Sequence, residues 1–162
     1  MSGPKGNLSL SGGNGFFQAD LPGAATSSPG TYTFTASGGK DIKGFTVAVN
    51  VSAPLTITNR PALATVTRTQ DTVVTWSGGF PSGDVQVEGE VGGKFGTVRF
   101  FCHAPSSAGQ LTVPASILAG MATGSGALVV TNVTAPQSIS ASGLDFGNAV
   151  VTVGTNVNTT FK

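Results

Sequence analysis

The sequence predicts an all-β protein, and more narrowly an immunoglobulin-like β-sandwich built from two packed modules. Charged residues make up only 9% of the 162 residues, and the chain contains 24 glycines. This composition favours strands and turns over helices. At least ten short alternating segments follow one another with turn residues between them, as in all-β domains. No segment has the length of a crossover helix, which excludes parallel βαβ units.

The core is expected to form around Asp71–Glu90, which contains the only tryptophan, Trp76. Val74 and Trp76 share one face of a strand because side chains alternate. A second strand follows, in which Val85 and Val87 alternate with polar residues. A run rich in glycine, serine and proline joins the two. We therefore predict a hairpin whose indole ring fills the space between two sheets.

The first module is predicted to cover residues 1–54 with four strands, at Asn7–Ser11, Gly15–Leu21, Thr31–Ala36 and Gly44–Ser52. The third is the clearest, with Tyr32, Phe34 and Ala36 on one face and Thr31, Thr33 and Thr35 on the other. Pro22–Gly30 is expected to be a loop. The strand at Asn7–Ser11 is expected to leave a sheet edge unpaired, and such edges recruit strands from other chains.

The second module is predicted to cover residues 55–162. Pro114–Met121 is the one expected helical turn, because proline favours a helix start and glycine its end. Besides the Trp76 hairpin, strands are expected at Leu55–Thr58, Ala64–Arg68, Phe95–His103, Gln110–Val113, Gly126–Val133, Ser138–Ala141, Ala149–Val153 and Asn158–Phe161.

Five segments are distinctive in their order: LTITNR (55–60), TVTRTQDTVVTWSGG (65–79), DVQVEGEV (84–91), FFCHAPSSAGQLTVPASIL (100–118) and VVTVG (150–154). Together they resemble the C-terminal region of uncharacterised secreted proteins that are abundant in Acidobacteria and related soil bacteria. PGTYTFTASGGKDIKGFTVAV (29–49) resembles the module that precedes this region in those proteins. The resemblance implies export and an immunoglobulin-like sandwich, and it brings no activity and no functional residue.

No catalytic, cofactor-binding or metal-ligating residue is predicted, and we expect no cofactor and no enzyme activity. His103 is the only histidine, and no serine lies in the G-x-S-x-G motif of a hydrolase. Cys102 and His103 are neighbours on a strand, so they point to opposite faces and cannot bind one zinc ion. We expect Cys102 to be a small buried residue and His103 to be exposed.

The acidic residues offer two weaker hypotheses. Asp84, Glu88 and Glu90 lie on one strand face, where they could form the carboxylate pair of a glycosidase or a Ca²⁺ site. Such a row is more often the solvated face of a half-buried strand, and no D-x-D-x-D-G loop is present. Three aspartates are isolated in predicted turns, at Asp41, Asp71 and Asp145.

Two further polar patterns have ordinary explanations. The threonine row at 31, 33 and 35 could bind ice or a glycan, but threonine is common on exposed strands and one strand is not an array. Four N-x-[ST] sequons begin at Asn7, Asn50, Asn132 and Asn158. They matter only in a host that glycosylates asparagine.

Charge and hydropathy limit the partners. The net charge of +1 gives no electrostatic footprint for nucleic acid. No run of 18 apolar residues is present, so no membrane span is predicted. The single cysteine excludes an internal disulfide. The N-terminus lacks the apolar region of a signal peptide, so the protein is either cytosolic or a mature form whose leader is absent from this chain. We expect the second, an extracellular protein.

The leading hypothesis is therefore a non-enzymatic extracellular protein with a structural or adhesive role, able to assemble edge to edge into fibres. The alternative is a carbohydrate-binding module of a secreted bacterial protein. Such a module needs exposed aromatic residues, and the sequence leaves few outside the core: Phe16, Phe80, Phe95 and Phe101. The expected partner is accordingly a second copy of the chain or a cell-surface glycan.

Overall fold

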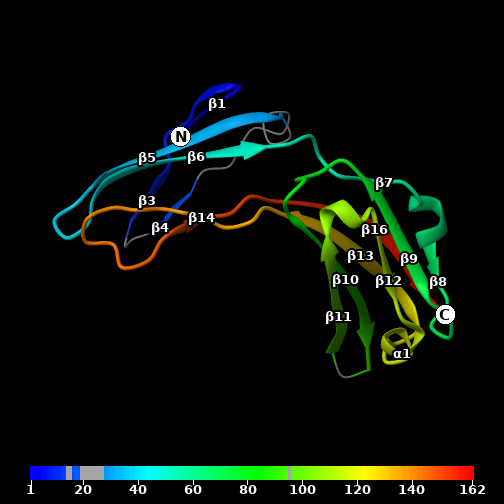
Figure 1. Ribbon diagram of the computed structural model, residues 1–162. Helices are drawn as coiled ribbons and strands as arrows, with labels where there is room; N and C mark the ends of the chain where they lie inside the picture. Colours follow the sequence, from blue (N-terminus) through cyan, green and yellow to red (C-terminus); the bar gives the residue numbers. More distant parts are fainter. Residues whose placement is uncertain (14–15, 19–27, 95) are drawn as a thin grey trace. The chain divides into compact units, whose positions relative to one another are not determined.

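A computed structural model describes residues 1–13, 16–18, 28–94 and 96–162, which lie mostly in β-strands arranged in several sheets (Figure 1). The all-β prediction is thus confirmed. The chain divides into two compact units. Unit 1 comprises Met1–Pro54 and Pro136–Val151, and unit 2 comprises Leu55–Ala135 and Thr152–Lys162.

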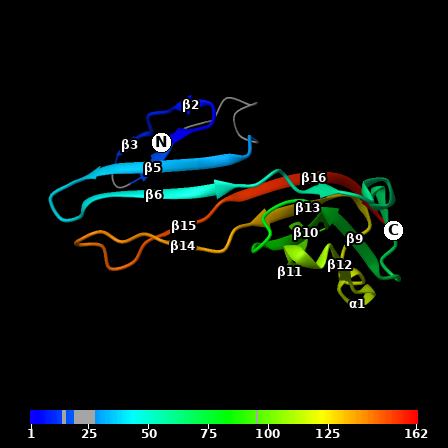
Figure 2. The ribbon, with the colours of Figure 1, turned by 45° about the horizontal axis from the view of Figure 1, so that its top comes forward.

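Unit 1 contains a four-stranded sheet in the order β2-β1-β5-β6 (Figure 2). Its strands are β1 (Ser2–Gly3), β2 (Gly6–Asn7), β5 (Gly30–Gly38) and β6 (Lys43–Val51). The long strands β5 and β6 pair antiparallel along their whole length. Tyr32, Val47 and Val49 are buried on one face, as the alternation predicts.

Residues 136–151 were expected in the second module, and the structure groups them with unit 1 instead. They form a small hairpin of β14 (Gln137–Ser138) and β15 (Asn148–Ala149). Ile139, Ala149 and Val151 from this segment pack against the buried cluster of Tyr32, Val47 and Val49. The hairpin supplies the apolar cover that residues 1–54 would lack alone.

The N-terminal strand prediction at Asn7–Ser11 is wrong. The chain instead makes a tight hairpin of β1 and β2 with Pro4 and Lys5 at its turn, where Gly6 adopts a φ of 111° that favours glycine. A second hairpin joins β3 (Ser11–Gly13) to β4 (Phe16–Gln18). The rest of the predicted strand at 15–21 and most of the predicted loop at 22–30 lie outside the described residues.

Unit 2 contains a five-stranded sheet in the order β11-β10-β13-β16-β8, and a three-stranded sheet in the order β12-β9-β7. The strands of the first are β8 (Thr65–Val66), β10 (Asp84–Gly93), β11 (Gly96–Pro105), β13 (Gly124–Val133) and β16 (Thr152–Phe161). Those of the second are β7 (Thr56–Ile57), β9 (Thr72–Ser77) and β12 (Gln110–Val113).

The predicted Trp76 hairpin is not formed. β9 pairs with β7 and β12, whereas β10 pairs with β11 and β13, so the two strands belong to different sheets. The connection between them crosses from one sheet to the other, and it is anchored by Phe80, whose side chain is buried. The predicted faces are nevertheless confirmed, because Val74, Trp76 and Val85 are all buried.

The C-terminal strand is longer than the sequence indicated. The segments predicted at Ala149–Val153 and Asn158–Phe161 are largely replaced by one strand, β16, which pairs with β13 from Thr152 to Phe161. Thr159 interrupts the apolar alternation on the inward face. It is buried all the same, because its hydroxyl donates to the carbonyl oxygen of Leu63 at 2.9 Å.

Both sheets of unit 2 contribute side chains to one apolar core. Leu63 from the 3₁₀ helix η2 (Arg60–Ala64) and Leu118 from α1 (Ala115–Leu118) complete it. The helical turn predicted at 114–121 is thus present but shorter. The largest fully buried side chains of the core are Phe161, Leu63, Leu118 and Leu128.

Gly89 gives a direct test of this packing. It lies opposite Phe100 in the β10–β11 pair, and a Cβ at Gly89 would overlap the ring of Phe100. We expect Gly89→Ala to lower the free energy of unfolding by about 1–3 kcal/mol, because an extra methyl group overpacks the core. Gly92→Ala on the same strand is the matched control, since a Cβ there meets open space. Equal urea midpoints for the two variants would contradict the packing.

Candidate functional site

The best candidate surface is the solvent-facing side of the β11-β10-β13 part of the five-stranded sheet. Alternation defines it, because Val85, Val87 and Phe100 are buried on the opposite side. The strand register places Glu88 beside Phe101, and Gln86 beside His103. We call this surface the outer face. It is formed by Gln86, Glu88 and Glu90 of β10, Arg99, Phe101 and His103 of β11, and Val129 and Thr131 of β13.

Phe101 is the most conspicuous residue of the outer face, with 67% of its surface exposed. Its neighbour Phe100 is buried, so the two rings point to opposite sides of β11. The prediction that Phe101 lies outside the core is confirmed. The same prediction for Phe80 is wrong, because that ring is 4% exposed. Phe95 and the side chain of Phe16 lie outside what the structure describes.

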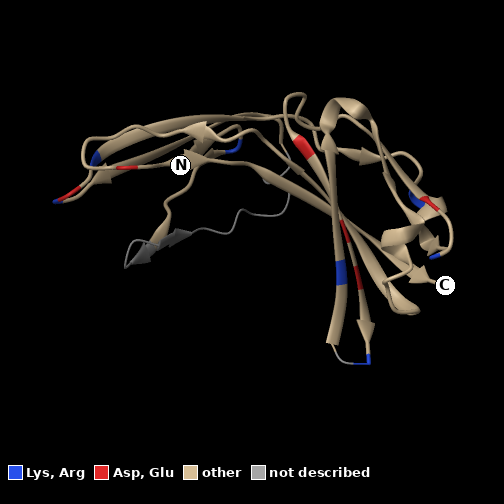
Figure 3. Cartoon of the chain, turned by 60° about the horizontal axis from the view of Figure 1, so that its bottom comes forward, with Lys and Arg blue, Asp and Glu red and all other residues tan. Residues whose placement is uncertain are grey.

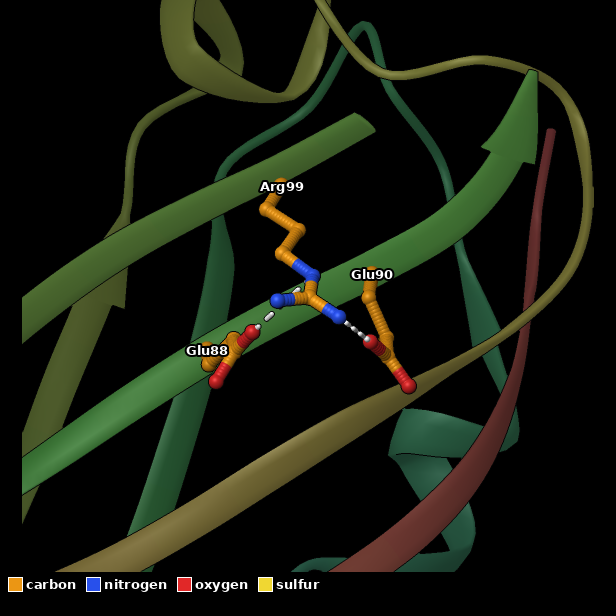
Figure 4. Close-up of polar contacts among 3 residues, drawn as sticks. All are labelled: Glu88, Glu90 and Arg99. Atoms are coloured by element: carbon orange, nitrogen blue, oxygen red, sulfur yellow. Dashed lines mark ion pairs between the residues drawn. The ribbon is translucent and has the colours of Figure 1, made fainter. Parts of the chain in front are cut away.

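The carboxylates of the outer face are held by one cation (Figure 4). Arg99 Nε lies 3.4 Å from Glu88 Oε1, and Arg99 Nη2 lies 3.1 Å from Glu90 Oε2. The guanidinium orients both carboxylates and offsets one of their two negative charges, so the three side chains together keep a net charge of −1. Both ion pairs are partly exposed, so each contributes only about 0–1 kcal/mol to stability. Asp84 begins the strand and is not part of these pairs.

Arg99 is the residue that sequence reasoning missed. The glycines between the two segments could have predicted that β10 and β11 form a hairpin. The register of that hairpin places Glu90 opposite Arg99, where their opposite charges attract. Of the aspartates predicted in turns, Asp71 makes a defined contact. Its carboxylate accepts a hydrogen bond from the Ala115 backbone N–H at 2.8 Å. Asp71 also lines a groove of about 220 Å³, together with Ala62, Leu63, Thr65, Thr67, Gln70, Thr72 and Val73.

Cys102 and His103 lie on opposite sides of β11, as predicted. His103 is exposed on the outer face, as predicted, whereas Cys102 is half-buried against the core of unit 2 and not the fully buried residue that we expected. Burial raises the pKa of the Cys102 thiol above its ordinary value. Across the described part of the chain, no three His, Cys, Asp or Glu side chains gather closely enough to hold a metal ion.

The raised pKa of Cys102 leads to a labelling prediction. Because the thiolate is the reactive form, we expect Cys102 to react more slowly with a maleimide or disulfide reagent in the folded protein than in urea. The labelling rate should rise with pH, and it should approach that of a free thiol only after unfolding. The pKa of the Cys102 thiol is higher in the folded than in the unfolded protein. The resulting contribution to stability is therefore fully present below the unfolded-state pKa, and it is lost as the pH rises through the folded-state pKa. Equal rates with and without urea would show that the thiol is not shielded.

A buried polar cluster at one end of unit 2 was also missed. Asn132 is 1% exposed, and its Oδ1 accepts a hydrogen bond from the Phe80 N–H at 2.7 Å. Its Nδ2 donates to the carbonyl oxygen of Asp84 at 3.0 Å and to Ser106 Oγ at 2.7 Å. The indole Nε1 of Trp76 donates to the Ser106 carbonyl oxygen at 2.9 Å. The alternation signalled this position, because Asn132 follows Leu128 and Val130 on the inward side.

Burial separates the four sequons. The Asn132 side chain is inaccessible in the folded protein, whereas Asn7, Asn50 and Asn158 are exposed.

The predicted threonine row is part of a wider hydroxyl-rich face on β5 and β6. Thr31 Oγ1 donates to Asn50 Oδ1 at 2.7 Å, and the hydroxyls of Thr35 and Thr46 lie 3.3 Å apart.

The chain matches no protein-family model, no curated protein and no solved structure. Every helix in the described ranges is too short or too polar to cross a membrane.

Proposed function

We propose that the protein is a non-enzymatic extracellular β-protein with a structural or adhesive role, and that it associates with further copies edge to edge. In this proposal its two compact units are modules, and unit 2 is an immunoglobulin-like β-sandwich. The observation that carries the proposal is β6, a nine-residue strand at the edge of the unit 1 sheet. Long edges without charge or proline are templates for another strand.

The sandwich assignment rests on how the core of unit 2 is made. Trp76 and Val113 of the three-stranded sheet belong to the same apolar cluster as Val87 and Val130 of the five-stranded sheet. Side chains from the facing sides of two sheets build the core of a sandwich in this way. The extracellular assignment rests on the resemblance to secreted proteins of soil bacteria and on the low charge.

The structural role is supported by how the polar groups are used. Arg99 holds both glutamates of the outer face, and Asn132 uses its amide oxygen and nitrogen within the core. Asp71 accepts a hydrogen bond from the start of α1. The polar side chains with the best-defined geometry therefore act in folding.

The test is the assembly state of the purified protein. Light scattering after size-exclusion chromatography should give a mass above that of one 16.1 kDa chain, with a β-rich circular dichroism spectrum. Electron microscopy of the same sample distinguishes closed oligomers from fibres. A single-chain mass up to the highest soluble concentration would contradict edge-to-edge association.

A second candidate function is carbohydrate binding, and the exposure of Phe101 favours it. An aromatic ring can stack on the apolar side of a sugar, while Gln86 and His103 beside it offer hydrogen bonds to hydroxyls. A glycan array probed with the wild type tests this candidate. Phe101→Ala should then abolish binding, whereas Phe146→Ala, which removes a 79% exposed ring from unit 1, should leave it intact. An array with no signal would remove the candidate.

A further inference from the structure

We propose that the outer edge of β6 is a homodimer interface, where β6 of a second copy pairs antiparallel about a two-fold axis at Val47. The inference rests on the proposed function and specifies its edge, its register and its stoichiometry. Within the part of the chain that the structure describes, β5 is the only sheet partner of β6. At the start of the strand the Lys43 N–H donates to the Ser142 carbonyl oxygen at 2.9 Å. The side of β6 that no described strand pairs with therefore runs from Gly44 to Val51.

The edge of β6 is regular. Its register with β5 runs from Gly30 opposite Val51 to Gly38 opposite Lys43 without a bulge. Lys43 is the only charged residue of the strand, and no proline interrupts it. In Figure 3 the charges of the β5–β6 hairpin gather around its turn, at residues 39–43, and the body of the hairpin carries none. Charge, proline and bulges are the features that protect an edge, and the body of β6 has none of them.

The other strands at the ends of the described sheets are short or charged. One long uncharged side also lies inside a sheet, because β8 pairs with β16 only at Thr160 and Phe161, and there Arg60 donates to the Asn156 carbonyl oxygen. β2, β7 and β8 have two residues each, and β12 has four. The long edge strand β11 carries Arg99 and His103. Among the terminal strands of the described sheets, β6 alone combines length with the high β-propensity sequence of GFTVAVNV.

A second copy fits this edge because the strand is complementary to itself. Antiparallel pairing about Val47 sets Phe45 opposite Val49 of the second copy, and Thr46 opposite Ala48 of the second copy. Apolar residues then meet on one side of the joined sheet and small or polar residues meet on the other. Lys43, whose N–H is bonded to Ser142 of its own chain, lies at the margin of this pairing, opposite Val51 of the second copy, so no like charges face each other.

The symmetry closes this assembly. An isologous pair uses the β6 edge of both copies and leaves β2, with two residues, at each end of the joined sheet. Two residues offer little further pairing, so we expect a dimer and not an open fibre.

Thr46 and Ala48 provide the test, because both are exposed and face each other across the proposed axis. Thr46→Lys with Ala48→Lys should give a monomer, since introduced lysines then oppose each other twice. Thr46→Glu with Ala48→Lys should remain a dimer, since each introduced glutamate faces an introduced lysine. The matched control is Thr31→Lys with Thr33→Lys on the inner strand β5, which should remain dimeric. Sedimentation velocity measures the mass, and circular dichroism checks the fold.

Mixing gives an independent readout. The double-lysine variant and a Thr46→Glu, Ala48→Glu variant should each be monomeric alone and should form a heterodimer when combined. A dimeric double-lysine variant, or no heterodimer on mixing, would overturn the β6 interface and leave edge-to-edge association by another edge standing. Fibres of the wild type would overturn the closed dimer only. A monomeric wild type would overturn both this inference and the proposed association.

Discussion

Trp76→Ala is expected to lower the free energy of unfolding by about 3–5 kcal/mol, the range for removing a large aromatic ring from a packed core. The side chain is 5% exposed and lies in the cluster shared by both sheets of unit 2. It also donates a hydrogen bond to the Ser106 carbonyl oxygen, which the variant leaves without this partner. Urea denaturation followed by circular dichroism measures the loss.

Trp76→Phe is the matched control. It keeps an aromatic ring and removes the indole N–H, so the loss should be smaller, on the order of 1–3 kcal/mol. Because Trp76 is the only tryptophan, the fluorescence of the wild type reports its environment directly. A red-shifted emission in the folded protein, as for an indole in water, would contradict its burial.

Asn132→Leu is expected to cost about 2–4 kcal/mol, because buried polar groups then lose their partners. The Phe80 N–H loses its acceptor, and the Ser106 hydroxyl loses the Nδ2 donor. These contacts tie β13 to the connection between the sheets and to the turn after β11. The leucine side chain has a similar volume, so the cost reports hydrogen bonds more than a cavity.

The control is Asn156→Leu on the neighbouring strand β16, where the side chain is exposed. We expect a change within about 0.5 kcal/mol for such a surface position. Chemical denaturation of both variants, analysed with a common slope, gives the difference. If Asn132→Leu proved as stable as Asn156→Leu, the polar cluster would contribute nothing to folding.

Strand faces could be predicted from the sequence, because alternation is a local property. Tyr32 and Val47 are buried and Thr31 is exposed, as their spacing predicts. Pairing is not local, which explains the failed Trp76 hairpin: both strands have an apolar side, and the sequence does not say which sheet each joins. Thr159 hid the length of β16, since its burial depends on the carbonyl oxygen of Leu63, distant in the chain.

In the candidate site, too, local features could be predicted from the sequence and features that depend on strand pairing could not. The opposite directions of Cys102 and His103 and the exposure of Phe101 follow from alternation alone. The shared ion pairs of Arg99 required the register between two strands. The sequence analysis placed Asn132 in a sequon and did not predict that it is buried. A polar residue of the core can be recognised only when its hydrogen-bond partners are known, and those of Asn132 are distant in the chain.

The discontinuity of unit 1 determines how the protein responds to proteolysis. The chain passes between the units three times, after Pro54, after Ala135 and after Val151. A single cut between Pro54 and Leu55 breaks the only covalent link between residues 1–54 and the rest of the chain. The hairpin at 136–151 would still hold that fragment through Ile139 and Val151. The nicked protein should therefore elute as one species under native conditions and as two fragments in denaturant. A protein that begins at Leu55 would leave the apolar side chains of this hairpin uncovered. To express unit 2 alone in soluble form, residues 136–151 should be replaced by a short turn. Such a turn can join β13 to β16, because Val133 and Thr152 are already paired.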